Sequence, residues 1–285
     1  MKNIYAIIPV RLGSVRLKKK NLAILNGKPL LTYAIKAAKK SGVFKKIYLN
    51  SESIKLKKYA KNFKIEFYQR NSNLASNTTK TDEVVKDFFD SMPNVDLLAW
   101  VGTTTPFQTS LQIKNAVKFF FKKKADTLML VENKFVHARH KNKALNYKKK
   151  NKFSRTQDLP PVQLFTYSLM MWKRKAFLKQ YKKTKTGILS GKVVYYSIPG
   201  NYGQSTIMIK HKRDFVLADH IMKSKKTFKI KYDSWVKKNT KLKKSYKHFI
   251  EKCVHFYSVI FPIYIQKLDK FTSKIELYYA IYIVF

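Results

Sequence analysis

The residues best suited to chemistry are cations that follow the first apolar run of the chain. The run Ile4 to Ile8 has the β-branched and aromatic composition of a buried strand, and Arg11, Gly13 and Arg16 come soon after it. Guanidinium groups bind phosphate oxygens in pairs, and a glycine lets the backbone approach a ligand closely. The pattern therefore predicts a strand that leads into an anion-binding loop.

Three lysines, Lys18 to Lys20, extend this loop. They add charge for a phosphate chain, or, as we prefer for Lys18 and Lys19, they belong to a solvated surface in a lysine-rich protein. A helix predicted to begin at Pro29 places the loop at the carboxyl end of the first strand, where open α/β sheets bind their ligands.

The chain beyond this loop alternates strand and helix patterns. Helix-like segments lie at 29–40, 54–60, 80–89 and 111–121, and strand-like segments lie between them at 47–49, 65–68, 95–101 and 127–131. This βαβαβ alternation predicts an α/β fold with a doubly wound, mostly parallel sheet. The pattern changes after position 131, and further apolar segments at 163–172, 193–198 and 206–209 precede a predicted helix at 212–222.

Two histidines stand three residues apart in the lysine-rich segment that follows the alternating part. His137 and His140 have a spacing that would allow metal binding, but no acidic or cysteine partner stands near them, so we interpret them as part of a surface loop. The stretch Arg155 to Pro161 has extended, proline-fixed character.

The charge of the chain is extreme. The 285 residues carry a formal net charge of +44, which suggests a nucleic acid or anionic membrane as partner. Only seven of the 60 basic residues are arginine, and the lysines accompany many residues with A/T-rich codons. Codon bias explains the charge as well as a polyanion does, and we expect no nucleic acid partner.

Other compositional features indicate a folded cytoplasmic protein. The hydrophobic content of 45% is enough for a core, and the single Cys253 excludes an intramolecular disulfide. Arg11 and Arg16 interrupt any apolar region of signal-peptide type. No window reaches the ~18 uncharged apolar residues of a membrane-spanning helix, and the run Val254 to Gln266 is too short.

Several stretches along the chain form an ordered series of motifs. They are Pro9 to Leu17 with Lys20-Asn21, Gly27 to Leu30, Ser41 to Ser53, Arg70 with Leu74 to Val85, Thr104 to Phe107, and Arg155 to Pro161. This series resembles the motifs of one enzyme family, the sugar-acid cytidylyltransferases. The resemblance covers residues 3–222 and is strongest to the acylneuraminate cytidylyltransferases. It implies a nucleotide-diphospho-sugar transferase-like fold over 1–222, with a dimerisation and sugar-contact insertion at 132–172 and a lysine- and aromatic-rich extension at 223–285.

The resemblance also implies a reaction. The anomeric hydroxyl of a sialic-type (nonulosonic) sugar acid would attack the α-phosphorus of CTP and release pyrophosphate, with Mg²⁺ assisting, in a cytoplasmic homodimer. Such a transfer depends on positioning and charge neutralisation more than on covalent chemistry. A basic loop that contains a glycine suits that need.

Roles follow for the matching positions. The catalytic cations would be Arg11 and Lys20. The nucleotide would contact Arg11, Gly13, Ser14, Arg16, Asn21, Arg70, Ala75, Ser76 and Asp82. The sugar acid would contact Thr104, Arg155 and Gln157. Two of these residues have a plainer alternative, because Asp82 also fits a helix-start acid and Asn21 a turn former.

Departures from the family pattern leave the metal ligands unassigned. Met208 and Lys210 stand where the family has two metal-binding aspartates, and neither side chain replaces a hard oxygen ligand. The remaining carboxylates to consider are Asp82, Asp158, Asp214 and Asp219. Other departures are Leu12, Val15, Glu52, Asn77, Gly102, Gln108 and the pair Thr166-Tyr167, which replaces an Asn-Gly pair.

The sequence thus supports a CMP-sugar-acid synthetase and leaves one alternative, a catalytically impaired nucleotide-binding or scaffold protein on the same fold. A polyanion-binding protein is a third hypothesis. For the extension from about Lys223, packing on the core, membrane contact and partner docking all remain open.

Overall fold

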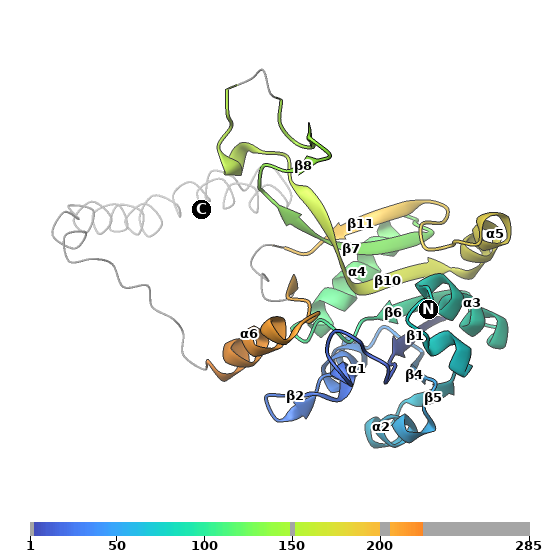
Figure 1. Ribbon diagram of the computed structural model, residues 1–285. Coiled ribbons are helices and arrows are strands. Elements are labelled where there is room, and N and C mark those ends of the chain that lie inside the picture. The colour runs from blue at the N-terminus through green and yellow to red at the C-terminus, as the bar shows by residue number, and fades with distance from the viewer. Residues whose placement is uncertain (1–2, 149–151, 200–205, 225–285) are drawn as a thin grey trace, which may run out of the picture. The chain divides into compact units, whose positions relative to one another are not determined.

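The computed structural model describes residues 3–148, 152–199 and 206–224. Its centre is a seven-stranded sheet in the order β11-β7-β10-β6-β1-β4-β5 (Figure 1). The strands are β1 (Ile4–Pro9), β4 (Lys46–Ser51), β5 (Glu66–Gln69), β6 (Leu97–Val101), β7 (Thr127–Lys134), β10 (Val162–Lys173) and β11 (Val193–Ser197). Two short hairpins lie outside this sheet, β2 (Ile24–Leu25) with β3 (Lys28–Pro29) and β8 (Arg139–His140) with β9 (Lys143–Ala144).

Strand direction explains where a ligand can enter. Strand β1 pairs in parallel with β4 on one side and β6 on the other, β4 with β5 and β7 with β11 are also parallel, and β10 runs antiparallel to both its neighbours. The prediction of a doubly wound, mostly parallel sheet is confirmed. The chain leaves β1 towards β5 and then returns to the other side of β1, so the crevice of a topological switch lies at the carboxyl end of β1.

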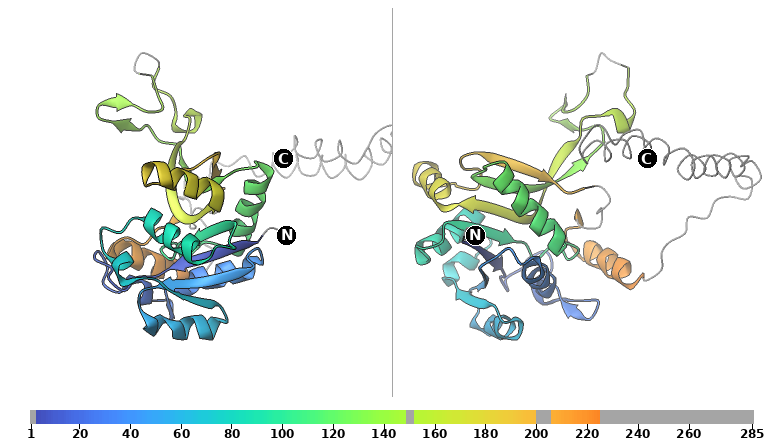
Figure 2. Two further views of the ribbon diagram at one scale, coloured as in Figure 1. Left: turned by 90° about the vertical axis from the view of Figure 1, so that its right-hand side faces the viewer. Right: turned by 180° about the vertical axis from the view of Figure 1, so that it is seen from behind.

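Helices cover both faces of the sheet (Figures 1 and 2). They are α1 (Leu31–Ser41), α2 (Lys57–Phe63), α3 (Thr81–Ser91), α4 (Ser110–Lys122), α5 (Arg174–Thr184) and α6 (Lys212–Lys223). Alternate side chains of β1 point to opposite faces, so Ile8 packs in the core with α1 and α4, while Ile7 packs in the core with α3 and α5. Both cores are buried, which fixes the strand register.

Most element predictions agree with the structure to within a few residues. Helix α1 ends where expected, because Gly42 takes the left-handed conformation that closes a helix (φ 67°). Helix α5 is absent from the sequence predictions. Four of its eleven residues are lysine, and Phe177, Leu178 and Tyr181 mark the side that packs on the core.

The segment between β7 and β10 projects from the sheet in its described parts (Figure 2). The ring of His137 stacks on Phe153 with centroids 3.9 Å apart, and Asn146 donates a hydrogen bond to the Pro160 carbonyl. His137 therefore serves the packing of this arm. Among the described residues no three histidine, cysteine, aspartate or glutamate side chains gather as a metal site would require.

The arm is shorter than the predicted insertion at 132–172, because the end of β10 is part of the central sheet. Leu169 to Trp172 are buried there between β6 and β7. Residues 225–285 lie outside the described part, and so do the predictions for the extension beyond Ser224. Within the described ranges, no helix has both the length and the apolar character to cross a membrane.

Candidate functional site

A cleft of about 370 Å³ opens at the carboxyl ends of β1 and β6, within the roughly 300–1,000 Å³ range of small-molecule sites. One part of its lining is cationic and comprises Arg11, Arg16, Lys20, Arg70 and Lys80. The other part is uncharged and includes Asn21, Trp100, Gly102, Thr103, Thr104, Tyr167 and Met170. The sheet predicts this position, and the residue types suit an anion joined to an uncharged group.

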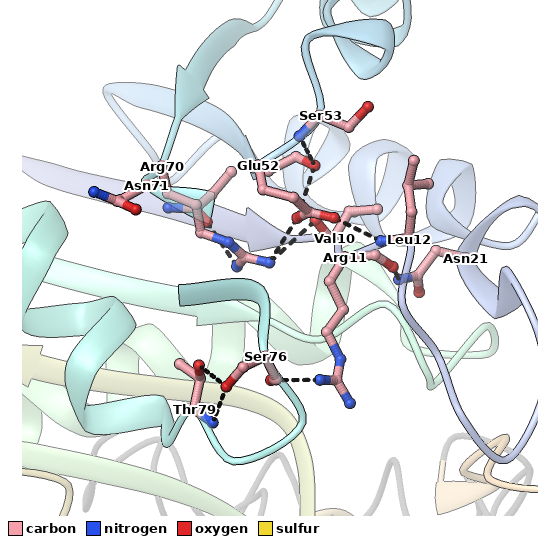
Figure 3. A network of polar contacts seen from close by, with 12 residues as sticks. Val10, Arg11, Leu12, Asn21, Glu52, Ser53, Arg70, Asn71, Ser76 and Thr79 are labelled. Carbon is pink, nitrogen blue, oxygen red and sulfur yellow. Dashed lines mark hydrogen bonds and ion pairs between the residues drawn. The ribbon is translucent and has the colours of Figure 1, made fainter. Parts of the chain in front are cut away.

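A buried ion pair holds the strand ends beneath the cleft (Figure 3). Arg70 is 5% exposed, and its guanidinium donates to Glu52 at 3.0 Å, to the Asn50 side chain at 3.0 Å and to the Val10 carbonyl at 3.4 Å. The second oxygen of Glu52 accepts a hydrogen bond from the Leu12 amide at 2.9 Å. The start of the cationic loop is thereby fixed to the ends of β4 and β5.

Arg11 joins this loop to the segment before α3. Its guanidinium donates to the Ser76 carbonyl at 2.7 Å (Figure 3). It also donates to the Asn77 side chain at 3.1 Å. Asn21 is buried, donates to the Arg11 carbonyl at 3.2 Å and accepts from the Thr103 hydroxyl at 2.8 Å. Asn21 therefore bridges the loop to the end of β6, which goes beyond the role of a turn former.

Lys20 lies where the loop meets the segment before α6. Its ammonium donates to the Ile209 carbonyl at 3.1 Å, while the Ile209 amide donates to the Thr104 carbonyl at 2.8 Å. Burial, with the nearby charges of Arg16 and Arg11, lowers the pKa of Lys20 to about 8. Lys18 and Lys19 are exposed and outside the cleft lining, as the solvated interpretation predicts.

Most of the residues assigned to the nucleotide are brought together here. Those that line the cleft are Arg11, Ser14, Arg16, Lys20, Asn21, Arg70 and Ser76, together with Thr104 from the predicted sugar contacts. Gly13 and Ala75 lie beside one another at its edge, where a Cβ on Gly13 would be 4.0 Å from the Ala75 carbonyl.

Asp82 does not take part in the cleft. Its Oδ1 accepts hydrogen bonds from the Thr186 hydroxyl at 3.0 Å, the Gly187 amide at 2.6 Å and the Ile188 amide at 3.2 Å. The carboxylate ties the start of α3 to the segment after α5. The expected nucleotide contact of Asp82 is therefore corrected to a structural role, because Asp82 is not part of the cleft lining and its Oδ1 holds the segment after α5.

Arg155 and Gln157 lie on the projecting arm and outside the lining of their own chain's cleft. Both are exposed, and Arg155 forms an ion pair with Asp158 at 2.7 Å, beside the short 3₁₀ turn Thr156–Asp158. A single copy of the chain does not bring these two residues to Lys20.

The four carboxylates considered for magnesium do not converge. Asp82 and Asp158 are engaged as described, Asp214 accepts from the amides of Lys210 and His211 at the start of α6, and Asp219 accepts from the Asn26 amide. The described lining of the cleft contains no carboxylate. The donor set therefore does not fit a magnesium ion held by the protein at this place.

Several lining residues were missing from the sequence predictions, notably Lys80, Trp100, Met170 and, as a site residue, Tyr167. Tyr167 lies where the pairing of β10 shifts register, and it adopts a left-handed backbone with φ 52°. A Cβ on Gly102 would be only 2.4 Å from the Tyr167 carbonyl. The sequence showed that positions 102 and 167 both depart from the family pattern. It did not show that the two residues contact each other across neighbouring strands.

Parts of this sequence are similar to those of known proteins. A family model described as cytidylyltransferase matches residues 5–257. An N-acylneuraminate cytidylyltransferase of Escherichia coli O18:K1:H7 is 34% identical over 117 residues, 41% of this chain and 28% of that protein. A pseudaminic acid cytidylyltransferase of Campylobacter jejuni serotype O:2 is 26% identical over 170 residues, 56% of this chain and 73% of that protein. The chain spans less than half the length of several relatives, including 44% of a Streptococcus agalactiae one.

Solved structures show the same fold. A CMP:2-keto-3-deoxy-manno-octonic acid synthetase complexed with CTP superimposes with a TM-score of 0.56 at 11% identity, over 79% of this chain and 100% of that one. At this identity the similarity concerns the fold alone.

Replacing Asp82 is expected to lower the stability of the protein. Asp82→Ala removes an acceptor that serves three donors, and we expect the free energy of unfolding in urea to fall by about 2–4 kcal/mol. Asp90→Ala on the same helix is the matched control, since Asp90 only pairs with Lys86 at the surface and should change stability by less than about 0.5 kcal/mol. Equal effects of the two substitutions would contradict the structural role.

Gly102 and Gly13 are expected to differ in how well they tolerate an added methyl group. Gly102→Ala places a methyl group against a backbone carbonyl and should destabilise the protein by about 2 kcal/mol. Gly13→Ala meets ordinary contact distances only and should change the melting temperature little. If Gly102→Ala melted like the unsubstituted protein, the close contact of β6 with Tyr167 would be disproved.

Proposed function

The chain belongs to the cytidylyltransferase family, and on that premise we propose that it transfers CMP from CTP to the anomeric hydroxyl of a sialic-type (nonulosonic) sugar acid, releasing pyrophosphate. The observation that carries this proposal is the convergence of Arg11, Arg16 and Lys20 on one cleft at the switch point of the sheet. The names of the relatives support the acceptor class.

The reaction needs a site that holds charge in place. The acceptor hydroxyl oxygen forms a bond to the α-phosphorus, the bond from that phosphorus to the oxygen leading to the β-phosphorus breaks, and pyrophosphate leaves with the electron pair. The proton of the hydroxyl passes to water. Arg11 and Lys20 would stabilise the charge that develops on the phosphoryl oxygens, because both are fixed by hydrogen bonds before the substrate arrives.

The acceptor would occupy the uncharged part of the cleft around Thr104. Arg155 and Gln157 would reach it only from a second copy of the chain, because each lies on an arm that projects from its own sheet. We therefore propose a homodimer in which the arm serves the neighbouring cleft. Sedimentation as a monomer at the concentration of an active sample would refute this arrangement.

The alternative function is nucleotide binding without turnover. It is favoured by Met208 and Lys210 and by the lack of acidic groups in the described lining of the cleft. Both functions require CTP binding, and only the first requires the release of pyrophosphate.

The decisive assay follows pyrophosphate release with CTP and N-acetylneuraminate, alongside melting curves with CTP. We expect CTP to raise the melting temperature and pyrophosphate to appear only when both substrates are present. Gly13→Ala should fold normally but bind CTP several-fold more weakly, because its methyl group would obstruct close approach of the phosphates. Binding without release over a panel of nonulosonic acids would favour the alternative, and an unmoved melting curve would exclude both.

The lowered pKa of Lys20 predicts how binding depends on pH. Its causes are burial, then Arg16 and Arg11, with Asp214 opposing them and Lys210 adding to them. Only the ammonium form attracts phosphate, so CTP affinity should hold below pH 8 and fall as pH rises above it, by at most about tenfold per pH unit. Lys20→Arg keeps its charge and should flatten the profile measured by titration calorimetry. Parallel profiles for the two proteins would assign the pH dependence to another group.

A further inference from the structure

We infer that this cleft neutralises the phosphate chain with its own side-chain cations, so that CTP binds without a divalent metal. The inference rests on the proposed function and concerns how the same site holds its nucleotide. It starts from the finding that the described carboxylates do not fit a magnesium ion.

Arginine is concentrated at the cleft in a way that general charge does not explain. Lysine is abundant throughout the chain, whereas three of the seven arginines, Arg11, Arg16 and Arg70, line this one cleft. A lysine excess from codon bias would not place arginines together. Arginine is also the side chain whose planar donors match phosphate oxygens.

Most of these cations lack an acidic partner. Among the described residues Arg70 is paired with Glu52, while Arg11, Arg16, Lys20 and Lys80 form no ion pair with a carboxylate. Like charges held close together repel, and the repulsion is greater where the site is partly buried. A polyanion that binds between these cations relieves their repulsion. A metal ion relieves the repulsion between carboxylates in the same way.

The segment where metal ligands would be expected also contributes positive charge. The ammonium of Lys20 contacts the carbonyl of Ile209, between Met208 and Lys210, and the charge of Lys210 acts on Lys20. The carboxylate of Asp214, whose charge also acts on Lys20, accepts two backbone amides at the start of α6. The ammonium of Lys20, with the charge of Lys210 nearby, therefore makes this edge of the cleft positive.

Calorimetric titration of the full chain with CTP, CDP and CMP tests the inference. Each titration is made once with EDTA and once with magnesium chloride. We expect the CTP dissociation constant in EDTA to lie within about threefold of that in magnesium, and the affinity to rise about tenfold with each added phosphate, the size of one charged hydrogen bond.

Two substitutions locate the effect. Lys20→Met and Arg16→Met should each weaken CTP binding in EDTA by about 10- to 100-fold and leave CMP binding nearly unchanged. Arg16 is exposed, so its loss does not threaten folding. Lys18→Met, in the same loop but outside the cleft, is the matched control and should bind like the unsubstituted protein.

The outcomes separate this inference from the function it rests on. CTP binding that appears only with magnesium, or CMP binding as tight as CTP binding, would overturn the inference and leave the CTP site intact. An absence of CTP binding under both conditions would overturn the proposed function as well.

Discussion

The structure of the site depends on one buried interaction, the ion pair between Arg70 and Glu52. Arg70 is almost fully enclosed and also holds the side chain of Asn50 and the carbonyl of Val10, while Glu52 holds the amide of Leu12. A buried pair of this kind contributes little net stability as a whole, but loss of one partner leaves a charge uncompensated. Its value here is positional, because it fixes the first residues of the cationic loop to the ends of three neighbouring strands.

Sequence patterns could predict the part of the fold that is governed by periodic burial. Strand β1 is apolar on both faces because both are covered, and its position at the switch follows from the order of the elements. Helix α5 could not be predicted in the same way, since it contacts the core through few side chains among many lysines. Local pattern fails where packing against a distant element determines the structure.

The site residues also divide into those that a local sequence pattern predicts and those that depend on contacts with distant segments. Arg11, Lys20 and Asn21 were predictable because they belong to one short loop, and the structure brings them to one cleft. The role of Asp82 could not be predicted from the sequence, because the three groups that donate hydrogen bonds to it lie more than 100 positions further along the chain. A carboxylate at the start of a helix suits a ligand, a helix terminus or a remote loop equally well, and only the fold distinguishes them.

The contact between Gly102 and Tyr167 links two departures that look separate in the sequence. Both positions depart from the family pattern, and Tyr167 stands where that pattern has a glycine. The backbone carbonyl of Tyr167 occupies the space that a side chain at 102, just after β6, would need, and Tyr167 holds this carbonyl there with a left-handed backbone (φ 52°). The size of the residue at 102 is therefore limited by the backbone path at 167 and not by a neighbouring side chain, so a larger residue at 102 would require the backbone of β10 to move.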